Sequence, residues 1–415
     1  MKKTMLLTMG MLLGAMLLTG CAAQSVDTDM LTSSASGDTA SAVQMSYTAE
    51  MAEASSELFT SRDLTQTADL SDAQYLTAAS GETLTITQEG VYVLSGSATD
   101  CTILVNAEDS AKVQLVLDRV SITNADFPVI YVVSADKVFV TTTDSENTLS
   151  VTGSYVSDGD TNTDAVIFSK EDLTLNGTGT LSVTSAAGNG ITSKDDLKIT
   201  GGTYTITSAL DALEANDNIL IADGSFTIRT DKDGLHSEND EDLTQGAVVI
   251  EGGTFDITAG SDGIQGTTTV TINGGTLDIQ AAEGIEATQV IINDGTISIE
   301  ATDDGINATA NANLSVSVTF NGGDTTIVMA QGDTDAVDAN GSIYVNDGTI
   351  NITAPCVSFD YDQTAEYNGG TIIINGQQVD SIPAEMMGGG MMGGQGGFGS
   401  QMGGGHMGVR GGRMM

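Results

Sequence analysis

The segment Val270-Thr-Ile-Asn-Gly-Gly-Thr-Leu-Asp-Ile279 carries a motif that recurs along most of this chain, in which two short apolar–polar alternations flank a glycine-threonine corner. Such alternation over a few residues is typical of short β-strands. The second glycine of the corner falls at positions 179, 202, 224, 253, 275, 295, 323, 348 and 370, so consecutive copies lie 20 to 29 residues apart. The motif therefore predicts a long repeat built from short strands.

The length of this repeat distinguishes between all-β folds. A β-sandwich would show turns every 8–12 residues or so without a long period, and no helical period interrupts the strands. A repeat of about 20–30 residues is typical of a solenoid in which each coil stacks on the one before it. We therefore predict an all-β fold, a right-handed parallel β-helix whose coils rise about 4.8 Å each.

The first residues resemble an export signal. Two lysines precede an apolar run over residues 5–18, which is shorter than the roughly 20 residues that span a bilayer. The run ends in Leu18-Thr-Gly-Cys21, which resembles a bacterial lipobox. We predict that residues 1–20 are a lipoprotein signal peptide and that Cys21 is lipidated. An ordinary signal peptide with an unmodified cysteine is the alternative.

Composition divides the remainder of the chain. Residues 21–62 are rich in Ser, Thr and Asp without clear periodicity, and we predict a disordered tether there. Residues 63–385 form the predicted β-helix, with residues 63–78 as a cap on its first coil. Residues 386–415 consist largely of Gly and Met and predict a disordered tail, because they cannot bury a core.

The charge of the chain excludes several partners. It has 56 Asp and Glu against 13 Lys and Arg, a formal net charge of −43. Nucleic acid and anionic lipid surfaces both require a basic patch, so we exclude nucleic acid and expect membrane attachment only through the lipid anchor. The chain has no Trp, which argues against a broad aromatic platform for stacking sugars. We expect a monomer.

Two cysteines fall inside the predicted β-helix. Cys101 and Cys356 are 255 residues apart and should lie near opposite ends of the solenoid. We therefore expect both to be buried and no disulfide to join them.

A second repeated motif places an acidic residue, a small residue and an aliphatic residue in order, once per coil. The acidic position is filled at Asp164, Asp211, Asp233, Asp262, Glu283, Asp304 and Asp335. The fourth position nearly always offers an oxygen or nitrogen donor: Glu214, His236, Gln265, Glu286, Asn307 and Asp338. Because carboxylates at strand spacing repel one another, the side chains either splay into water or hold a hard cation. The alternative is an Asp turn that hydrogen-bonds its own backbone.

In their order, these triplets resemble the extracellular carbohydrate-binding β-helix domains of clostridia, a family similar to pectate-lyase-like helices. The type member of that family binds cellulose and polygalacturonate and contains calcium. The resemblance spans roughly residues 80–380. Together with the repeat pattern it implies calcium ligands among Asp211, Glu214, Asp233, His236, Glu238, Asp262, Glu283, Glu286, Asp304, Asp335 and Asp338. The sequence departs from the family pattern at Asp211-Ala-Leu213 and at inserts that follow Asn239 and Asn307.

Three functions are consistent with these features. The first is a cell-surface lipoprotein on the extracytoplasmic face of a bacterial envelope, which binds plant-type or acidic polysaccharide through calcium without catalysis. The second is a calcium-dependent, pectate-type lyase, which would need a basic residue near the ion. Candidates are Lys170, Lys194, Lys198, Arg229 and Lys232, but none is assigned a catalytic role. The third is a structural or adhesive spacer.

Overall fold

The computed structural model describes residues 58–239, 241–331 and 334–383. The chain divides into two units, residues 1–52 and 53–415, and the first lies wholly outside the described residues. The predicted signal peptide, Cys21, most of the tether and the glycine-methionine tail also lie outside them. Among the described residues, no helix is long and apolar enough to cross a bilayer.

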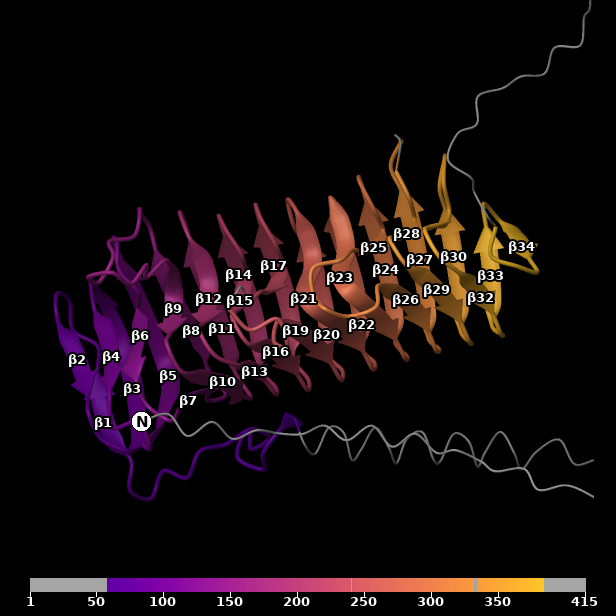
Figure 1. Cartoon of the computed structure of the whole chain (residues 1–415). Helices are drawn as coiled ribbons and strands as arrows, with labels where there is room; N and C mark the ends of the chain where they lie inside the picture. Colours follow the sequence, from indigo (N-terminus) through magenta and orange to yellow (C-terminus); the bar gives the residue numbers. More distant parts are fainter. Residues whose placement is uncertain (1–57, 240, 332–333, 384–415) are drawn as a thin grey trace, which may run out of the picture. The chain divides into compact units, whose positions relative to one another are not determined.

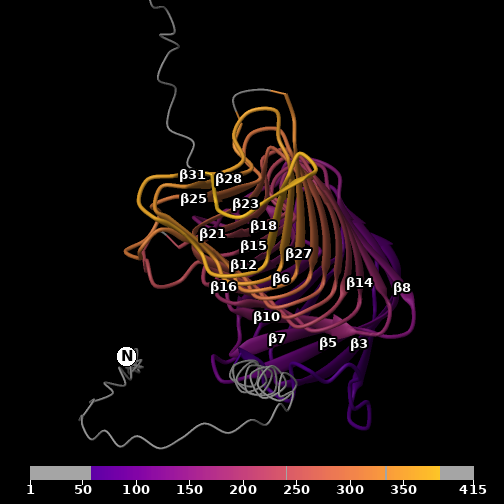
Figure 2. The same cartoon turned by 90° about the vertical axis from the view of Figure 1, so that its right-hand side faces the viewer.

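The elements of the described chain are 34 strands, which wind into stacked coils with three faces (Figures 1 and 2). The first face contains β1 (Gln74–Thr77), β7 (Lys137–Thr142), β10 (Asp172–Gly177), β13 (Leu197–Ile199), β16 (Asn218–Ile221), β19 (Ala247–Ile250), β26 (Ser317–Phe320), β29 (Ser342–Val345) and β32 (Ala365–Tyr367).

The second face follows the first in each coil. It contains β8 (Glu146–Val151), β11 (Thr180–Ser185), β14 (Thr203–Ser208), β17 (Ser225–Thr230), β20 (Thr254–Thr258), β22 (Thr276–Ala281), β24 (Thr296–Ala301), β27 (Asp324–Met329), β30 (Thr349–Thr353), β33 (Thr371–Ile374) and β34 (Gln377–Val379).

The third face completes the coil. It contains β2 (Thr83–Ile86), β4 (Thr102–Asn106), β6 (Ile130–Ser134), β9 (Ala165–Ser169), β12 (Asn189–Ser193), β15 (Leu213–Ala215), β18 (Leu235–Ser237), β25 (Ile306–Ala308), β28 (Val337–Ala339) and β31 (Asp360–Tyr361). Four longer strands turn a corner and serve two faces: β3 (Gly90–Thr99), β5 (Lys112–Asn124), β21 (Asp262–Ile272) and β23 (Glu283–Ile292).

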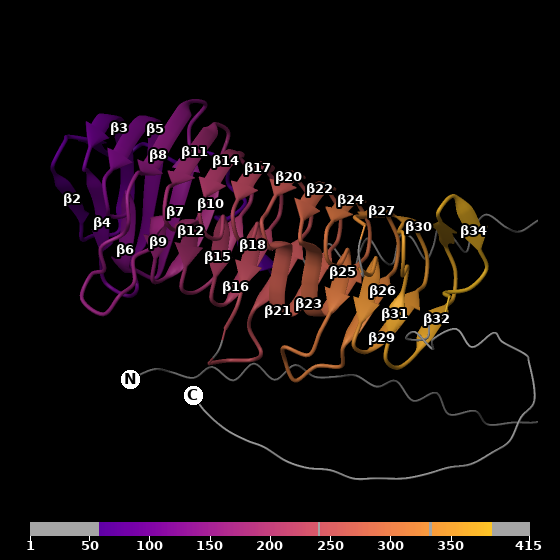
Figure 3. The same ribbon diagram turned by 90° about the horizontal axis from the view of Figure 1, so that it is seen from above.

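Pairing between coils is parallel throughout the stack, and the final pair, β33 with β34, is antiparallel. This arrangement confirms the prediction of a parallel β-helix. The two predicted inserts are loops that project between β18 and β19 and between β25 and β26 (Figure 3).

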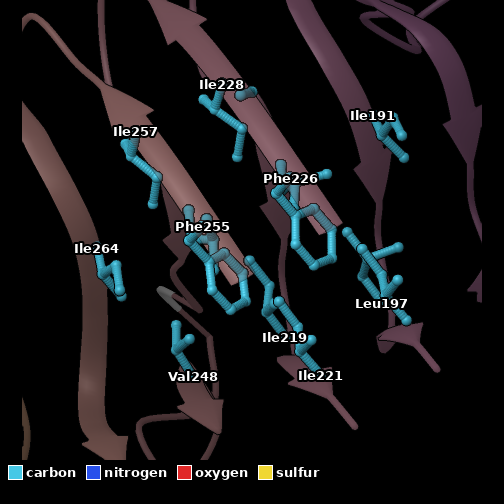
Figure 4. Packing of buried hydrophobic residues seen from close by; sticks show 14 of the residues in the cluster. Ile191, Leu197, Ile219, Ile221, Phe226, Ile228, Val248, Phe255, Ile257 and Ile264 are labelled. Carbon is cyan, nitrogen blue, oxygen red and sulfur yellow. The ribbon is translucent and has the colours of Figure 1, made fainter. Parts of the chain in front are cut away.

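The core consists of inward-facing aliphatic residues that stack on their counterparts in neighbouring coils. Ile228, Ile257 and Ile279 occupy one register column and are fully buried. Beside them, the rings of Phe226 and Phe255 stack with their centroids 4.6 Å apart (Figure 4). A coil cannot bury these side chains alone, so the stacking of coils supplies the stability of the fold.

Glycine serves two different purposes in the repeat. At the corner, Gly275 has a φ of 100°, a conformation that L side chains rarely adopt. In the Asp-Gly-Ile triplets the constraint is space, because a Cβ at Gly284 would lie 2.3 Å from the carbonyl oxygen of Gly305 in the next coil. Ala212 and Ala336 fill the same slot in two other coils, where a fully buried methyl group is accommodated.

The chain before β1 does not cap the first coil, which corrects that expectation. Residues 58–67, here called the N-terminal strap, run along the first face beside β7, β10 and β13 (Figure 1). Asp63 is fully buried there and accepts hydrogen bonds from Thr174 Oγ1 at 2.8 Å and Lys137 Nζ at 3.3 Å. Residues 58–62, assigned to the tether from composition, thus belong to a packed segment.

No disulfide joins Cys101 and Cys356, as expected. Cys101 is buried, but Cys356 is exposed, so the prediction that both would be buried is wrong for the second. Cys356 lies in the turn between β30 and β31, between the buried core residues Ala354 and Phe359.

Candidate functional site

The acidic triplets lie along the third face, where each acidic residue stands at or just before the start of a strand. Asp211, Asp233 and Asp262 are buried, with 2–6% of their surface exposed. The remaining predicted members of this column are half-buried: Glu283, Asp304 and Asp335. Asp262 and Glu283 are direct register partners. The repeat therefore brings these predicted acidic residues into one column. Asp164 is the exception, because Ala165 and not Asp164 is the register partner of Asn189.

The buried aspartates form a hydrogen-bonded ladder between coils. The backbone N–H of Asp233 donates to Oδ1 of Asp211 at 3.1 Å, and that of Asp262 donates to Oδ1 of Asp233 at 3.0 Å. Asn189 begins the ladder by accepting the N–H of Asp211 at 2.9 Å. The Asp-turn hypothesis is thus wrong about the donor, which belongs to the next coil and not to the aspartate's own turn.

The fourth positions form a second column on the outer surface of the same face. Glu214, His236 and Gln265 are consecutive register partners. Glu286, Asn307 and Asp338 continue the column in the next coils. The two columns lie side by side. Carboxylates from the acidic column and from the fourth-position column can therefore converge on one place between them.

The first such cluster contains its own cations. Asp211, Asp233 and His236 place ligand atoms within 4.8 Å of one another. Lys232 Nζ, however, lies 2.9 Å from Asp211 Oδ2 and 3.6 Å from Asp233 Oδ2. His236 Nδ1 lies 3.2 Å from the same Asp211 oxygen. An ammonium group therefore occupies the space that a metal ion would need.

The proton affinities in this cluster follow from these contacts. Burial alone would raise the pKa of Asp211, but hydrogen bonds and charge from His236 and Lys232 outweigh it and lower the pKa to about 2. Burial opposes the charged forms of Lys232 and His236, yet the neighbouring aspartates raise the pKa of both. The cluster is thus an ion-paired network in which Lys232 contacts Asp211 and Asp233, and His236 contacts the same two carboxylates.

Two other predicted ligands are also bound to neighbouring side chains. Glu214 accepts hydrogen bonds from Thr192 Oγ1 at 2.7 Å and from Lys194 Nζ at 3.1 Å. Glu238 is exposed, and its Oε2 lies 3.4 Å from His236 Nε2. Both residues extend the ion-paired network of the first cluster.

The second cluster consists of carboxylates alone. Asp262, Glu283 and Glu286 each place an oxygen within 4.8 Å of the others. Asparagine side chains donate to the two glutamates, Asn307 to Glu283 at 2.9 Å and Asn311 to Glu286 at 3.0 Å. Among the described residues, Asp262 receives only a long hydrogen bond from Ser261 Oγ, at 3.4 Å. No described cation contacts these three carboxylates.

Burial first, and then the charges of Asp233, Glu283 and Glu286, raise the pKa of Asp262 to about 8. The acidic column continues beyond this cluster with the same character. Burial and neighbouring carboxylates raise the pKa of Asp304 to about 6 and that of Asp338 to about 7. Along the described part of this face, Asp304, Asp335 and Asp338 do not complete a third three-ligand group.

The difference between the clusters reflects a division of charge that the sequence analysis missed. Residues 233–383 contain 24 Asp and Glu and no Lys or Arg. Of the nine basic residues between positions 58 and 232, Arg62 lies in the N-terminal strap and the other eight lie in the earlier coils. A count of charged residues along the sequence shows this division directly. It marks the part of the chain in which no Lys or Arg is present to pair with the carboxylates.

Comparison with known proteins identifies the family to which this chain belongs. The pattern that defines a family described as "Carbohydrate-binding domain-containing protein" matches residues 80–336. The chain belongs to this carbohydrate-binding domain family. The family resemblance seen in the sequence is thereby confirmed, and the match covers all the coils from β2 to the start of β28.

One relative carries the same family description. This protein of Acetivibrio thermocellus is 40% identical over 124 residues, which is 29% of this chain and 43% of the relative. The match therefore spans less than half of that curated relative. A solved structure of a polysaccharide lyase-like protein from C. thermocellum, a gadolinium derivative, is 26% identical with a TM-score of 0.44, covering 68% of this chain and 98% of that one.

Proposed function

We propose that this member of the carbohydrate-binding domain family is a non-catalytic, calcium-dependent polysaccharide-binding protein. The observation that carries the proposal is the cluster of Asp262, Glu283 and Glu286, three carboxylates that converge without a cation. Holding like charges together in a partly buried site costs free energy, which a bound cation would recover.

The donor set of the second cluster fits calcium. Ca²⁺ takes six to eight oxygen ligands at about 2.3–2.6 Å, so opposed ligand oxygens lie roughly 5 Å apart or closer. The three carboxylates meet this limit. Asn307 adds a buried Oδ1 for which no hydrogen-bond donor is found among the described residues. A carbonyl oxygen without a donor beside carboxylates is a ligand that calcium accepts.

The first cluster does not fit calcium. Lys232 already neutralises Asp211 and Asp233, and His236 supplies nitrogen, which hard cations disfavour. We therefore propose Asp262, Glu283 and Glu286, with Asn307, as ligands. Asp211, Glu214, Asp233, His236 and Glu238 are instead a network that compensates its own charge.

A bound calcium ion would supply a positive centre through which an acidic sugar could attach to an otherwise acidic face. The protein's own contribution is to hold the ligands rigidly, because each sits on a strand or corner fixed by the coils on both sides. An acidic polysaccharide is accordingly the proposed partner at this face.

The contacts of the basic residues argue against a lyase. A catalytic base must lose its proton near neutral pH, but the pKa of Lys232 is raised by Asp211 and Asp233. Lys194 is paired with Glu214 at 3.1 Å. Lys170 and Lys194 each lie near an aromatic ring, 5.9 Å from Tyr131 and 5.8 Å from Phe168, respectively. These contacts suit structural lysines.

We further propose that the protein is a monomeric lipoprotein, anchored through Cys21 to the outer side of a bacterial envelope. The lipobox-like segment supports this part of the proposal. Metabolic labelling with a fatty acid, compared between wild type and Cys21→Ser, tests the anchor.

Retention on immobilised polygalacturonate tests the main proposal. We expect the wild type to be retained in calcium and released by EDTA, and Asp262→Asn/Glu286→Gln to be released in both. The exposed pair Asp278→Asn/Asp294→Asn is the matched control and should behave as wild type. Retention that is insensitive to EDTA would refute the role of calcium. Formation of unsaturated sugar products would revive the lyase, and the absence of retention on any glycan would favour the spacer.

A further inference from the structure

A groove runs along the corner where the second face meets the third. It consists of two adjoining cavities of about 440 Å³ and about 390 Å³, and Thr258 lines both. Its edge passes from Thr184 through Arg229, Thr258 and Gln280 to Val328, which occupy one register column at the ends of successive second-face strands. The groove therefore crosses the strands and runs parallel to the stacking axis.

The floor of the larger cavity is apolar. Ala281, Ala301 and Met329 are buried and occupy one register column. Ala282 and Ala330 are half-buried and lie beside them. A depression floored by methyl groups and a thioether presents apolar surface that a binding partner would remove from water.

The backbone around the groove restricts how a partner can bind. An extended peptide adds to a sheet by pairing with free N–H and C=O groups on an edge strand. The strands beside the larger cavity are instead paired with neighbouring coils on both sides. A partner here must therefore pack apolar side chains on the floor.

The chain itself supplies a segment of this character beyond the described residues. Residues 391–402 read Met-Met-Gly-Gly-Gln-Gly-Gly-Phe-Gly-Ser-Gln-Met and contain no charged side chain. Methionine is unbranched and fits irregular apolar gaps, and glycine allows a backbone to approach a surface closely. The segment therefore combines one aromatic anchor, Phe398, with apolar side chains suited to a shallow groove.

The distance between this segment and the groove is short enough for docking. Ile382 is buried in the core at the last coil, and Phe398 follows Pro383 by 15 residues. A glycine-rich chain of that length has an r.m.s. end-to-end distance of roughly 21 Å. Three coil steps lead from β33 through β30 and β27 to β24, a span of roughly 14 Å along the axis. Such a tether gives an effective concentration in the millimolar range, so weak contacts suffice.

Charge favours the tail over the body of a second copy. Residues 386–415 contain two arginines, Arg410 and Arg413, and no Asp or Glu. Glu300 is exposed at the groove edge, and no described cation pairs with it. The body of a second copy would bring the same negative charge to this edge and be repelled.

We propose that residues 391–402 dock in this groove of their own chain, with Phe398 in the larger cavity and the methionines along the apolar floor. Arg410 follows Phe398 by 12 residues and supplies a cation for Glu300. While it is docked, the tail closes the corner between the second and third faces to other ligands. Neither calcium nor a polysaccharide takes part in this contact, so the inference stands apart from the proposed function.

A single tryptophan in the tail tests the inference. The chain contains no Trp, so Phe398→Trp places the only such reporter in the whole protein. Docking should shield it from quenching by acrylamide. Ala282→Phe/Ala330→Phe fills the groove at half-buried positions, and we expect it to raise the quenching constant roughly threefold. Thr276→Phe, at an exposed position of β22, is the matched control and should leave quenching unchanged.

Met391→Ser/Met392→Ser/Met402→Ser covers the case in which the phenylalanines disturb folding, because it changes only the tail. It should expose the reporter to the same extent, whereas Met414→Ser/Met415→Ser should not. A reporter that is equally accessible with the native and the filled groove would overturn the inference. Shielding that grows with protein concentration would place the tail of a second copy in the groove and would overturn the intramolecular contact.

Discussion

The backbone N–H of Asp262 donates to Oδ1 of Asp233 at 3.0 Å, but Asp262 does not in turn accept the N–H of Glu283. The N–H of Glu283 bonds instead to the carbonyl of Ser261 at 3.2 Å. The ladder of aspartates is therefore interrupted at Asp262, whose buried carboxylate receives no backbone donor among the described residues, and it resumes where the N–H of Asp335 donates to Oδ1 of Asp304 at 3.1 Å. This interruption lies inside the region that lacks Lys and Arg, which begins at residue 233, and it is where we place the calcium ion.

Asp262→Asn should raise the stability of the calcium-free protein and abolish its response to calcium. The substitution removes a buried carboxyl group that the metal-free folded state must keep protonated at a cost in free energy, so we expect it to stabilise the metal-free fold at neutral pH by about 1–2 kcal/mol. Thermal unfolding with EDTA and with calcium measures both effects. Asp278→Asn, on an exposed position of β22, should leave the calcium-induced increase intact.

Lys232→Met should destabilise the first cluster. It leaves Asp211 and Asp233, at 4% and 3% side-chain exposure, without their ammonium partner. We expect a loss of about 2 kcal/mol, below the cost for a fully buried pair because the lysine is 44% exposed. Lys112→Met, which breaks an exposed pair with Asp136, should cost much less. Equal losses in chemical denaturation would contradict the assigned role of Lys232.

Stability of the calcium-free protein should fall as the pH rises from about 4 to 8. The folded state keeps a proton on Asp262, whose pKa is about 8, whereas the unfolded chain releases it near pH 3.9. Because the folded state binds more protons in this window, each pH unit costs up to about 1.4 kcal/mol. The raised pKa values of Asp304 and Asp338 likewise lower the stability of the folded state as the pH rises. Saturating calcium should flatten the curve, and parallel curves with and without calcium would refute the site.

Asp63→Ala should release the N-terminal strap. Asp63 is fully buried against Lys137 and Thr174, so its removal leaves a nearly buried ammonium group with only Asp172, at 3.6 Å. We expect a loss of about 3 kcal/mol and rapid tryptic cleavage at Arg62. The exposed Asp69→Ala is the control. Unchanged cleavage would show that other strap contacts hold the segment.

Gly284→Ala tests the close approach of coils in the acidic face. Its Cβ would meet the Gly305 carbonyl at 2.3 Å and Ile299 Cγ2 at 2.5 Å. We expect a loss of about 2 kcal/mol through forced separation of the coils, with a weaker calcium response because Glu283 and Glu286 flank this residue. Gly252→Ala, whose Cβ would meet only Ala222 O at 3.2 Å, should be tolerated.

Much of this architecture was predictable because, in a solenoid, residues that are one repeat apart in the sequence lie next to each other in adjacent coils. Residues one repeat apart, such as Ile257 and Ile279, become register partners. The glycine corners and the column that contains Asp211, Asp233 and Asp262 follow for the same reason. Burial of Cys356 was mispredicted because this residue lies in a turn between β30 and β31, outside the strands whose alternation fixes which side chains face inward.

The sequence by itself determined the parallel β-helix, its inward aliphatic columns and the presence of an acidic face, since all three depend on contacts between successive coils. Only the tertiary structure decided which carboxylates are compensated. Whether Lys232 reaches Asp211 or solvent depends on side-chain direction, which a repeat does not encode. Packing of the strap likewise joins Asp63 to Thr174 across 111 residues, a contact set by the path of the chain outside the repeat.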